Sequence, residues 1–289
     1  MTVREHPRFL ARLLFLAALF VLGLWLRNLQ TRIANGHPEW RPWAATPIVT
    51  LYFDEGRFLF PVSRRVSSRD GLAQVALQSL LDGPRPGTGL RNSIPSGVQI
   101  RSLKIQGGVA HINLSWIPSD AAETALIETM TALRGISSVE LSVDGQSRGH
   151  SVTRIPLIYF ASANGLVAIP TTAAKPREAL ERYLAGPPAP DLTGLPPDVQ
   201  LLAHEYDSAD GLLTLKFSYT PSLRAAAIER PERMRTVLLG LIATLTEFPE
   251  VRAVQLDFGG QTRLGLGQCS DLLRTPQPRP SLLNDERLL

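Results

Sequence analysis

The stretch IVTLYFDEGRFLFPVSRRV, residues 48–66, decides the fold, because a related stretch, IPLIYFASANGLVAIPTTA, recurs at residues 155–173. Further pairs of similar segments follow in the same order, at offsets between 101 and 115 residues: 77–84 with 180–187, 94–100 with 195–201, 107–115 with 210–218, and 137–148 with 252–263. Matching blocks in one order at a nearly constant spacing indicate an internal repeat. The chain therefore carries two copies of one domain of about 100 residues, a common domain size. We place the copies at residues 47–150 and 151–268.

Each copy is predicted to form the element order ββαββαβ. Alternating apolar residues predict two hairpins, apolar residues at helical spacing predict two helices, and an apolar run predicts a last strand. In copy one the elements are, in order, a hairpin turning at 54–56, a helix from Asp70 to Gly83-Pro84, a hairpin turning at 107–108, a helix from Asp120 with Glu123 as a capping box, and a strand at 139–143. This order implies a mixed sheet with helices packed against it, an α+β domain. Residues 219–230 read as an insertion in copy two.

The ordered set of motifs resembles the GerMN domain of sporulation and spore-germination proteins and of some envelope lipoproteins. The resemblance rests on LYF (51–53), LLDGP (80–84), IPSGV (94–98) and GGVAHINLS (107–115), each with a counterpart in copy two. It implies a membrane-attached, extracytoplasmic, non-catalytic module, similar to the ring-building modules that assemble side by side. The chain departs from the lipoprotein members because no cysteine follows its N-terminal apolar run.

That apolar run, FLARLLFLAALFVLGLWL at residues 9–26, is interrupted only by Arg12. Eighteen helical residues span about 27 Å, enough for the hydrocarbon core of a membrane. We therefore predict a transmembrane anchor at 9–27, a cytoplasmic stub at 1–8 and a linker at 28–46, with the bulk of the chain extracytoplasmic. A cleaved signal peptide is the alternative, although no Ala-x-Ala cleavage site follows the run.

Charge and composition exclude several classes of protein. With 44% hydrophobic and 19% charged residues the chain is a folded protein, not a disordered one. Its net charge of +4 resides entirely in residues 1–45, so the globular part is neutral and predicts no nucleic-acid partner. The single cysteine, Cys269, excludes internal disulfides and thiolate clusters.

One motif points to catalysis. Residues 145–149, GQSRG, match the G-x-S-x-G nucleophile elbow, with Ser147 as the nucleophile. An elbow requires a helix directly after the serine, whereas the lead into copy two's first strand follows here. Thr262 stands at the equivalent position of copy two, and no histidines share a ligand spacing. We therefore predict no catalytic residue, no metal site and no cofactor.

Two Pro/Gly-rich loops, at 83–97 and 186–198, are the candidate sites, because irregular loops of this length are often functional. The alternative is that they are rigid connectors between a helix end and the next strand. The residues singled out are Gly83, Pro84, Arg85, Pro95, Gly186, Pro187 and Pro196. Residues 269–289 have little periodicity and predict a flexible tail.

The sequence thus predicts a non-enzymatic, membrane-anchored envelope protein whose two domains mediate binding or assembly. Its partners would be the membrane, other envelope proteins or peptidoglycan, and further copies of itself in a lateral homo-oligomer. A cell-wall hydrolase and a soluble small-ligand-binding protein are the alternatives. About ten residues connect the copies, too few for independent domains, so the copies are expected to pack in one orientation with helices 120–134 or 231–247 partly buried between them.

Overall fold

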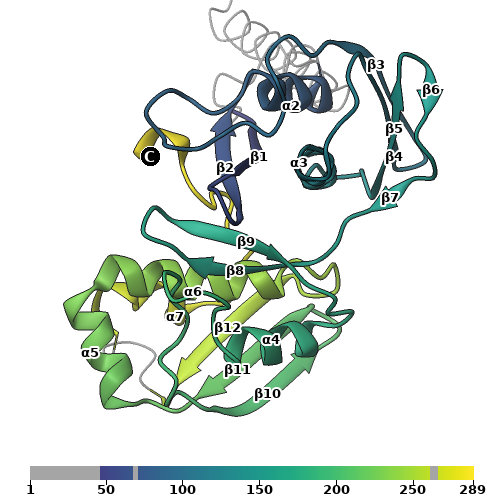
Figure 1. The fold of residues 1–289 in the computed structure, drawn as a ribbon. Coiled ribbons are helices and arrows are strands. Elements are labelled where there is room, and N and C mark those ends of the chain that lie inside the picture. Colours follow the sequence, from purple (N-terminus) through teal and green to yellow (C-terminus); the bar gives the residue numbers. More distant parts are fainter. Residues whose placement is uncertain (1–45, 68–70, 261–265) are drawn as a thin grey trace, which may run out of the picture. The chain divides into compact units, whose positions relative to one another are not determined.

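The computed structural model describes residues 46–67, 71–260 and 266–289 (Figure 1). The predicted stub at 1–8, the anchor at 9–27 and nearly all of the linker at 28–46 lie outside these residues. Within the described part, no helix is long and apolar enough to cross a membrane. Residues 46–289 form one compact unit that contains both copies.

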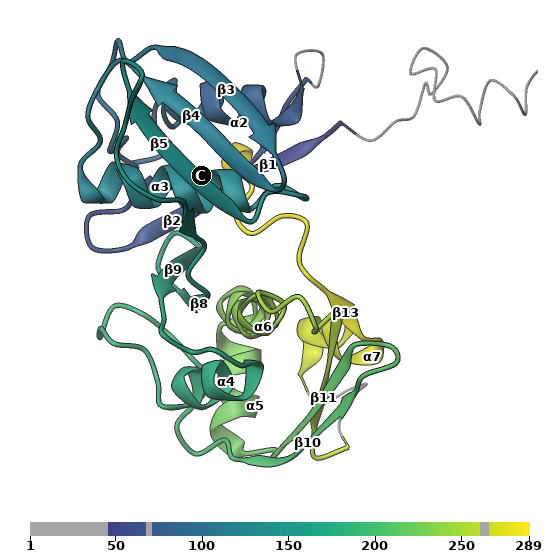
Figure 2. The same ribbon diagram turned by 90° about the vertical axis from the view of Figure 1, so that its right-hand side faces the viewer.

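Both copies adopt the predicted element order. Copy one consists of β1 (Ile48–Asp54), β2 (Leu59–Arg65), α2 (Leu72–Leu81), β3 (Ile100–Gln106), β4 (Val109–Leu114), α3 (Asp120–Thr131) and β5 (Ser138–Val143). Copy two consists of β8 (Leu157–Ala161), β9 (Leu166–Pro170), α4 (Pro176–Leu184), β10 (Leu201–Asp207), β11 (Leu212–Phe217), α6 (Pro231–Leu245) and β12 (Ala253–Phe258). The sheets are mixed as predicted, because β4 runs antiparallel to β3 and parallel to β5, and β11 relates to β10 and β12 in the same way. In the rotated view β3, β4 and β5 lie side by side, with α2 and α3 against one face (Figure 2).

Local chemistry explains the element ends. The Gly107-Gly108 turn has positive φ angles of 59° and 82°, which glycine adopts without strain. Gly83, with a φ of 85°, lies directly after the C-cap of α2 and ends the helix. One detail of the prediction was wrong: the N-cap of α3 is Ser119, whose side chain accepts a hydrogen bond from the Ala122 amide, and Asp120 lies inside the first turn.

The insertion in copy two forms a helix of its own. Helix α5 (Pro221–Glu229) begins after Thr220, whose side chain accepts a hydrogen bond from the backbone N–H of Leu223. It packs against α6 and buries Leu223 and Ala227. Copy two therefore contains a helix that copy one lacks.

The first hairpins of the two copies join into one sheet with the strand order β1-β2-β9-β8. Strand β2 pairs antiparallel with β9 at Leu59 and Ala168. The outer strands are shielded by helices: the Thr129 hydroxyl of α3 accepts a hydrogen bond from the Tyr52 amide at 3.1 Å, and the Thr244 hydroxyl of α6 accepts one from the Tyr159 amide at 2.9 Å. Covering an edge in this way satisfies backbone groups that would otherwise recruit another strand.

Helix α6 lies very close to β8. A Cβ placed on Gly240 would lie 2.6 Å from the Tyr159 carbonyl oxygen, so only glycine permits this approach. Buried apolar residues of both copies fill the space beside the shared sheet: Tyr52, Leu157, Tyr159, Leu166, Ala168 and Ala243, with Ala132 and Leu239 packed against them. The expectation that the copies pack together through parts of these two helices is therefore confirmed.

The C-terminal segment differs from the prediction of a flexible tail. It contains the short elements η2 (Gly267–Cys269), α7 (Asp271–Arg274), β13 (Gln277–Pro278) and η3 (Glu286–Leu288). Strand β13 pairs with β12, and Leu272, Leu273 and Leu283 are buried. The prediction failed because these contacts are made to residues far away in the sequence, which local periodicity does not report.

Candidate functional site

A buried polar cluster lies where the two copies meet, and we call it the inter-repeat cluster. At its centre are Tyr52 of β1 and Tyr159 of β8, which occupy equivalent positions of the repeat. Both side chains are fully buried, and their hydroxyl oxygens are 3.1 Å apart. Buried hydroxyls require partners, and charged side chains from three other segments provide them.

Arg154, in the connector between the copies, provides the first of these charges. Its guanidinium donates to the Tyr52 hydroxyl at 3.2 Å and to Glu247 at 2.9 Å. Its Nε lies 3.2 Å from Oε2 of Glu128, within ion-pair range, although these two atoms form no hydrogen bond of regular geometry. The Glu128 and Glu247 side chains are only 2% and 1% exposed, so both carboxylates require a cationic partner, and for Glu128 that partner is Arg154.

Arg279 of the C-terminal segment completes the inter-repeat cluster. It forms an ion pair with Glu247 at 2.5 Å and donates to the Tyr159 hydroxyl at 3.2 Å. The same hydroxyl donates to Glu247 at 2.6 Å. The cluster thus contains two arginines and two glutamates, and its formal charge is balanced.

Burial controls protonation in the inter-repeat cluster. It raises the pKa of Glu128 to about 7, partly opposed by Arg154. It also raises the pKa values of Tyr52 and Tyr159, so both phenols remain neutral at physiological pH. A neutral phenol beside a carboxylate that is fully held by arginines is a poor nucleophile. The arrangement is suited to fastening the copies together.

The raised pKa of Glu128 predicts that stability falls as the pH rises. In the unfolded chain this carboxyl ionises near its ordinary pKa of about 4.5, and in the folded chain near 7. Folding therefore favours the protonated form, and its contribution is full below pH 4.5 and is lost as the pH rises through 7. Between pH 5 and pH 8 we expect the free energy of unfolding to fall by roughly 1–3 kcal/mol. Urea unfolding at several pH values measures this, and Glu128→Gln should remove most of the slope; an equally steep slope in that variant would contradict the assignment.

Asn284 provides a second junction between the copies. Strands β2 and β9 pair directly at Leu59 and Ala168. In the repeat, Leu59 is equivalent to Leu166 and Ala168 to Pro61, so a second pairing of the same kind would join Leu166 and Pro61. Pro61 has no N–H to donate, so that second pairing cannot form. The Asn284 amide takes its place: Nδ2 donates to the carbonyls of Pro61 at 2.7 Å and Leu166 at 2.8 Å, and Oδ1 accepts from the Leu166 amide at 2.8 Å. Gly165 is required beside it, because a Cβ there would overlap Oδ1 of Asn284.

The two predicted loops lie in different copies, 83–97 in copy one and 186–198 in copy two. In loop 83–97, Arg85 contacts Glu286 of the C-terminal segment at 3.3 Å, and the Gly83 carbonyl accepts a hydrogen bond from Arg64 at 2.8 Å. Each loop also pairs with the end of its own first strand, through Asp54–Arg91 and Ala161–Thr193. Gly83 is buried, Arg85 and Pro95 are exposed, and the remaining candidates are half-buried: Pro84, Gly186, Pro187 and Pro196. None of them joins the inter-repeat cluster. These contacts give both loops the geometry of connectors.

The chain matches a known protein family over both copies. The family model described as sporulation and spore germination, Germane, matches residues 50–149 and 157–264. The chain belongs to this family. It is a tandem GerMN-domain protein.

A solved structure shares the fold. The tandem GerMN domains of the sporulation protein GerM from Bacillus subtilis match with a TM-score of 0.62 and 18% sequence identity, over 83% of this chain and 99% of that one. The first GerMN domain of the same protein matches 38% of this chain and 94% of that one, at 19% identity and a TM-score of 0.31. No curated protein matches the chain.

The GerMN fold places Ser147 where a nucleophile elbow cannot form. Gln146 and Ser147 form β6, a two-residue strand that turns back on β5, and the Ser147 hydroxyl donates to the Gly149 carbonyl at 3.0 Å. Residues 148–156, which follow the serine and are all described, contain no helix whose N-terminus could face it. Among the described residues, no group of three or more His, Cys, Asp or Glu side chains could hold a metal ion.

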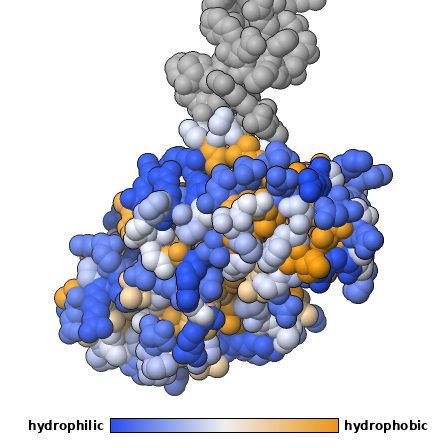
Figure 3. Space-filling model, turned by 45° about the horizontal axis from the view of Figure 1, so that its top comes forward, coloured by the Kyte–Doolittle hydropathy of each residue, from blue (hydrophilic) through white to orange (hydrophobic). Residues whose placement is uncertain are grey.

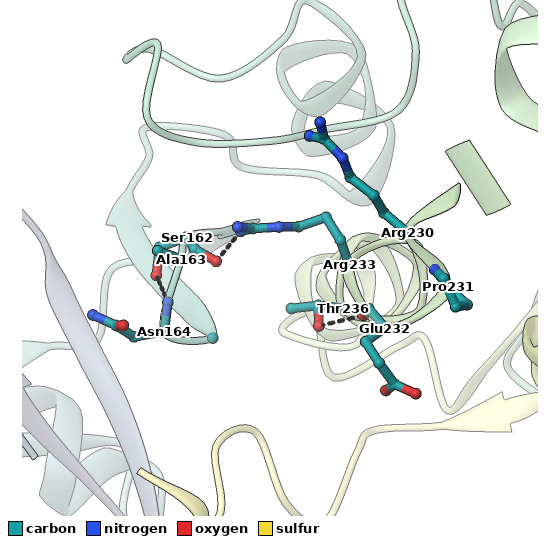
Figure 4. A pocket seen from close by; sticks show the side chains of 9 residues that line it. Ser162, Ala163, Asn164, Arg230, Pro231, Glu232, Arg233 and Thr236 are labelled. Carbon is teal, nitrogen blue, oxygen red and sulfur yellow. Dashed lines mark hydrogen bonds between the residues drawn. The ribbon is translucent and has the colours of Figure 1, made fainter. Parts of the chain in front are cut away.

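A cavity of about 470 Å³ lies in the second GerMN domain, between the β8–β9 turn and the start of α6 (Figure 4). Arg230, Glu232 and Arg233 are among the residues that line it. Arg233 is already engaged, since it donates to the Ser162 carbonyl across the cavity. A second cavity, of about 460 Å³, borders α5.

Sequence reasoning missed every member of the inter-repeat cluster. One signal was present: Tyr52 and Tyr159 are aligned by the repeat within otherwise apolar strands. A second was Glu128, a carboxylate among the apolar residues of its helix. Arg154 and Arg279 carried no local signal, because one lies in a connector and the other near the C-terminus.

Proposed function

We propose that this chain is a non-enzymatic, membrane-anchored protein of the cell envelope, whose tandem GerMN domains act together as one binding and assembly module. One observation carries the proposal. The two domains are joined by a common sheet, by the inter-repeat cluster and by the C-terminal segment, so they present their surfaces in one fixed relation. A fixed relation between the two surfaces suits a scaffold that engages its partners through both domains.

Two further considerations support it. The fold is that of the tandem GerMN domains of a sporulation protein, and a role in sporulation or germination follows for this chain by analogy of fold. In the proposed arrangement, the apolar run at 9–27, which follows two arginines, attaches the protein to the membrane. Partners would then be other envelope proteins, peptidoglycan or further copies of the chain.

Labelling with a membrane-impermeant maleimide tests the topology. Ser208→Cys places a thiol in the exposed turn between β10 and β11, and Thr2→Cys places one in the predicted cytoplasmic stub. In intact cells expressing the full chain, the thiol of the Ser208→Cys variant should be labelled, whereas that of the Thr2→Cys variant should be labelled only after lysis. The wild-type chain is the blank, because Cys269 is buried and burial raises the pKa of its thiol to about 11.

Two outcomes would overturn the proposed topology. Labelling of the stub and protection of the β10–β11 turn in intact cells would place the GerMN domains in the cytoplasm. Recovery of a chain that begins near residue 35 or 46 would show cleavage instead of anchoring, which N-terminal sequencing detects.

The alternatives have less support. A hydrolase would need a nucleophile and a base in contact, and Ser147 is bonded to a backbone carbonyl instead. A binding protein with its ligand between the copies would need a cavity there. The space beside the shared sheet is filled by tyrosine and leucine side chains, and both cavities described above are lined by copy two alone.

A further inference from the structure

The edges of the shared sheet are covered by helices, whereas β3 and β10 are open edges of the other two sheets. The shared sheet has helices over both of its outer strands, through Thr129 and Thr244. Strands β3 and β10 each end their sheet, and no other strand of the described residues pairs with their outer sides. Such an edge presents backbone N–H and C=O groups that can pair with a further strand.

The two open edges carry opposite charges. Strand β3 carries Arg101 and Lys104, whereas β10 carries Glu205 and Asp207, and all four side chains are exposed. Within the described residues, Arg101 forms an ion pair with Asp144 and Glu205 forms one with Lys216 of β11, whereas Lys104 and Asp207 form none. Lys104 lies opposite His111 of β4, and Glu205 opposite Thr214 of β11. These are equivalent positions of the repeat, so the two copies present a reversed charge at the same place.

Exposed apolar side chains accompany these charges. Ile105 on β3 is 49% exposed, and Leu202 and Tyr206 on β10 are 63% and 46% exposed. The face shown in Figure 3 is mostly hydrophilic, with small separate apolar patches. Single exposed apolar side chains are common on protein surfaces, and the Tyr206 hydroxyl is bonded to the Glu250 carbonyl, so these residues would add contact area to a strand pair without specifying it.

We infer that β3 of one molecule pairs with β10 of a second copy of this chain. Like charges oppose the pairing of two β3 strands or of two β10 strands, and opposite charges favour the mixed pair. Both strands have a bulge at their first residues, which leaves 102–106 and 203–207 as regular pairing segments. An antiparallel pair with Lys104 opposite Glu205 also sets Leu103 opposite Tyr206. Because the joined edges differ, each molecule can bind two neighbours, and assembly is head-to-tail.

This inference rests on the proposed assembly role and specifies its partner as a second copy. Cysteine cross-linking of the full chain in membranes tests it. In the Lys104→Cys/Glu205→Cys double variant the paired Cβ atoms would lie about 5 Å apart, close enough for a disulfide. Mild oxidation should give a ladder of linked dimers, trimers and larger species. Each single variant should remain monomeric, because its thiol would face an unmodified residue.

Charge reversal separates the pairing from a general loss of structure. The reversals are made in a Lys216→Gln background, because Lys216 pairs with Glu205 within the molecule. In that background Lys104→Glu and Glu205→Lys should each weaken self-association roughly 3- to 5-fold, and the double reversal should restore it, because the opposite charges face each other again. Analytical ultracentrifugation in detergent measures this. Cross-linked dimers of either single-cysteine variant, or no ladder from the double variant, would overturn the inference. The maleimide labelling described above would still succeed in that case, so failure of this interface is distinguishable from failure of the proposed envelope role.

Discussion

Replacing Arg154 with methionine is expected to lower the free energy of unfolding by roughly 3–5 kcal/mol, the usual cost of leaving a buried charge without its partner. The arginine serves two carboxylates at once, Glu128 and Glu247, which are almost completely buried. Methionine preserves most of the side-chain volume, so the effect measures lost charge and hydrogen bonds more than a cavity. Urea unfolding above pH 8, where the Glu128 carboxyl of the wild-type protein is ionised, provides the measurement.

A matched control and a rescue accompany this experiment. Arg177→Met removes an arginine whose partner, Glu181, is on the surface, and the midpoint of unfolding should not move. Adding Glu128→Gln to Arg154→Met should recover part of the loss, because the Glu128 carboxyl, which loses its ion-pair partner, is then replaced by a neutral amide, whereas Glu247 keeps Arg279. If Arg154→Met behaves like the surface control, the inter-repeat cluster does not fasten the copies.

The second large effect is expected for Asn284→Leu. Leucine has a similar size but cannot bond the Pro61 carbonyl or the N–H and C=O groups of Leu166, which would remain buried without partners. At about 1–3 kcal/mol for each unsatisfied group, partly relieved by relaxation, we expect a loss of roughly 2–4 kcal/mol in the free energy of unfolding. Thermal and urea unfolding check this value.

Asn164→Leu is the matched control, since it makes the same change in an exposed residue of the adjacent β8–β9 turn. In the described part of the chain, its side-chain amide donates to Glu55 at the surface. An additional readout is protection of the Leu166 amide from hydrogen exchange, which should fall in Asn284→Leu and persist in the control. Full protection of that amide in Asn284→Leu would show that another group replaces the asparagine.

The repeat made the fold of each copy predictable. Hairpins, helices and the closing strand follow from periodicities within about 20 residues, and both copies give the same answer. The order ββαββαβ and the turn at Gly107-Gly108 are examples. Helix α5 was not predicted because it has no counterpart against which to align.

The way in which the copies join was much less predictable. Asn284 lies in a segment of low periodicity, and its role depends on Pro61 lacking an N–H more than 200 positions earlier. Arg154 looked like an ordinary residue of a polar connector. Both act through contacts distant in sequence, which composition and spacing do not encode. The Pro/Gly loops drew attention because of their composition, although the structure ties them to neighbouring elements of the fold.

The contacts of Asn284 also have a consequence for the order of folding. It binds Pro61 across 223 positions, and Leu283 binds Ser63 across 220. At translation rates of about 5–20 residues per second, residue 284 is synthesised roughly 10–45 s after β2 is synthesised. Copy one, whose own contacts are local, has time to fold in that interval, but one side of β2 remains unpaired. The nascent chain therefore carries a transiently unpaired strand edge that can pair with other chains. A chaperone or a slow export step that shields this edge would raise the yield of correctly joined molecules.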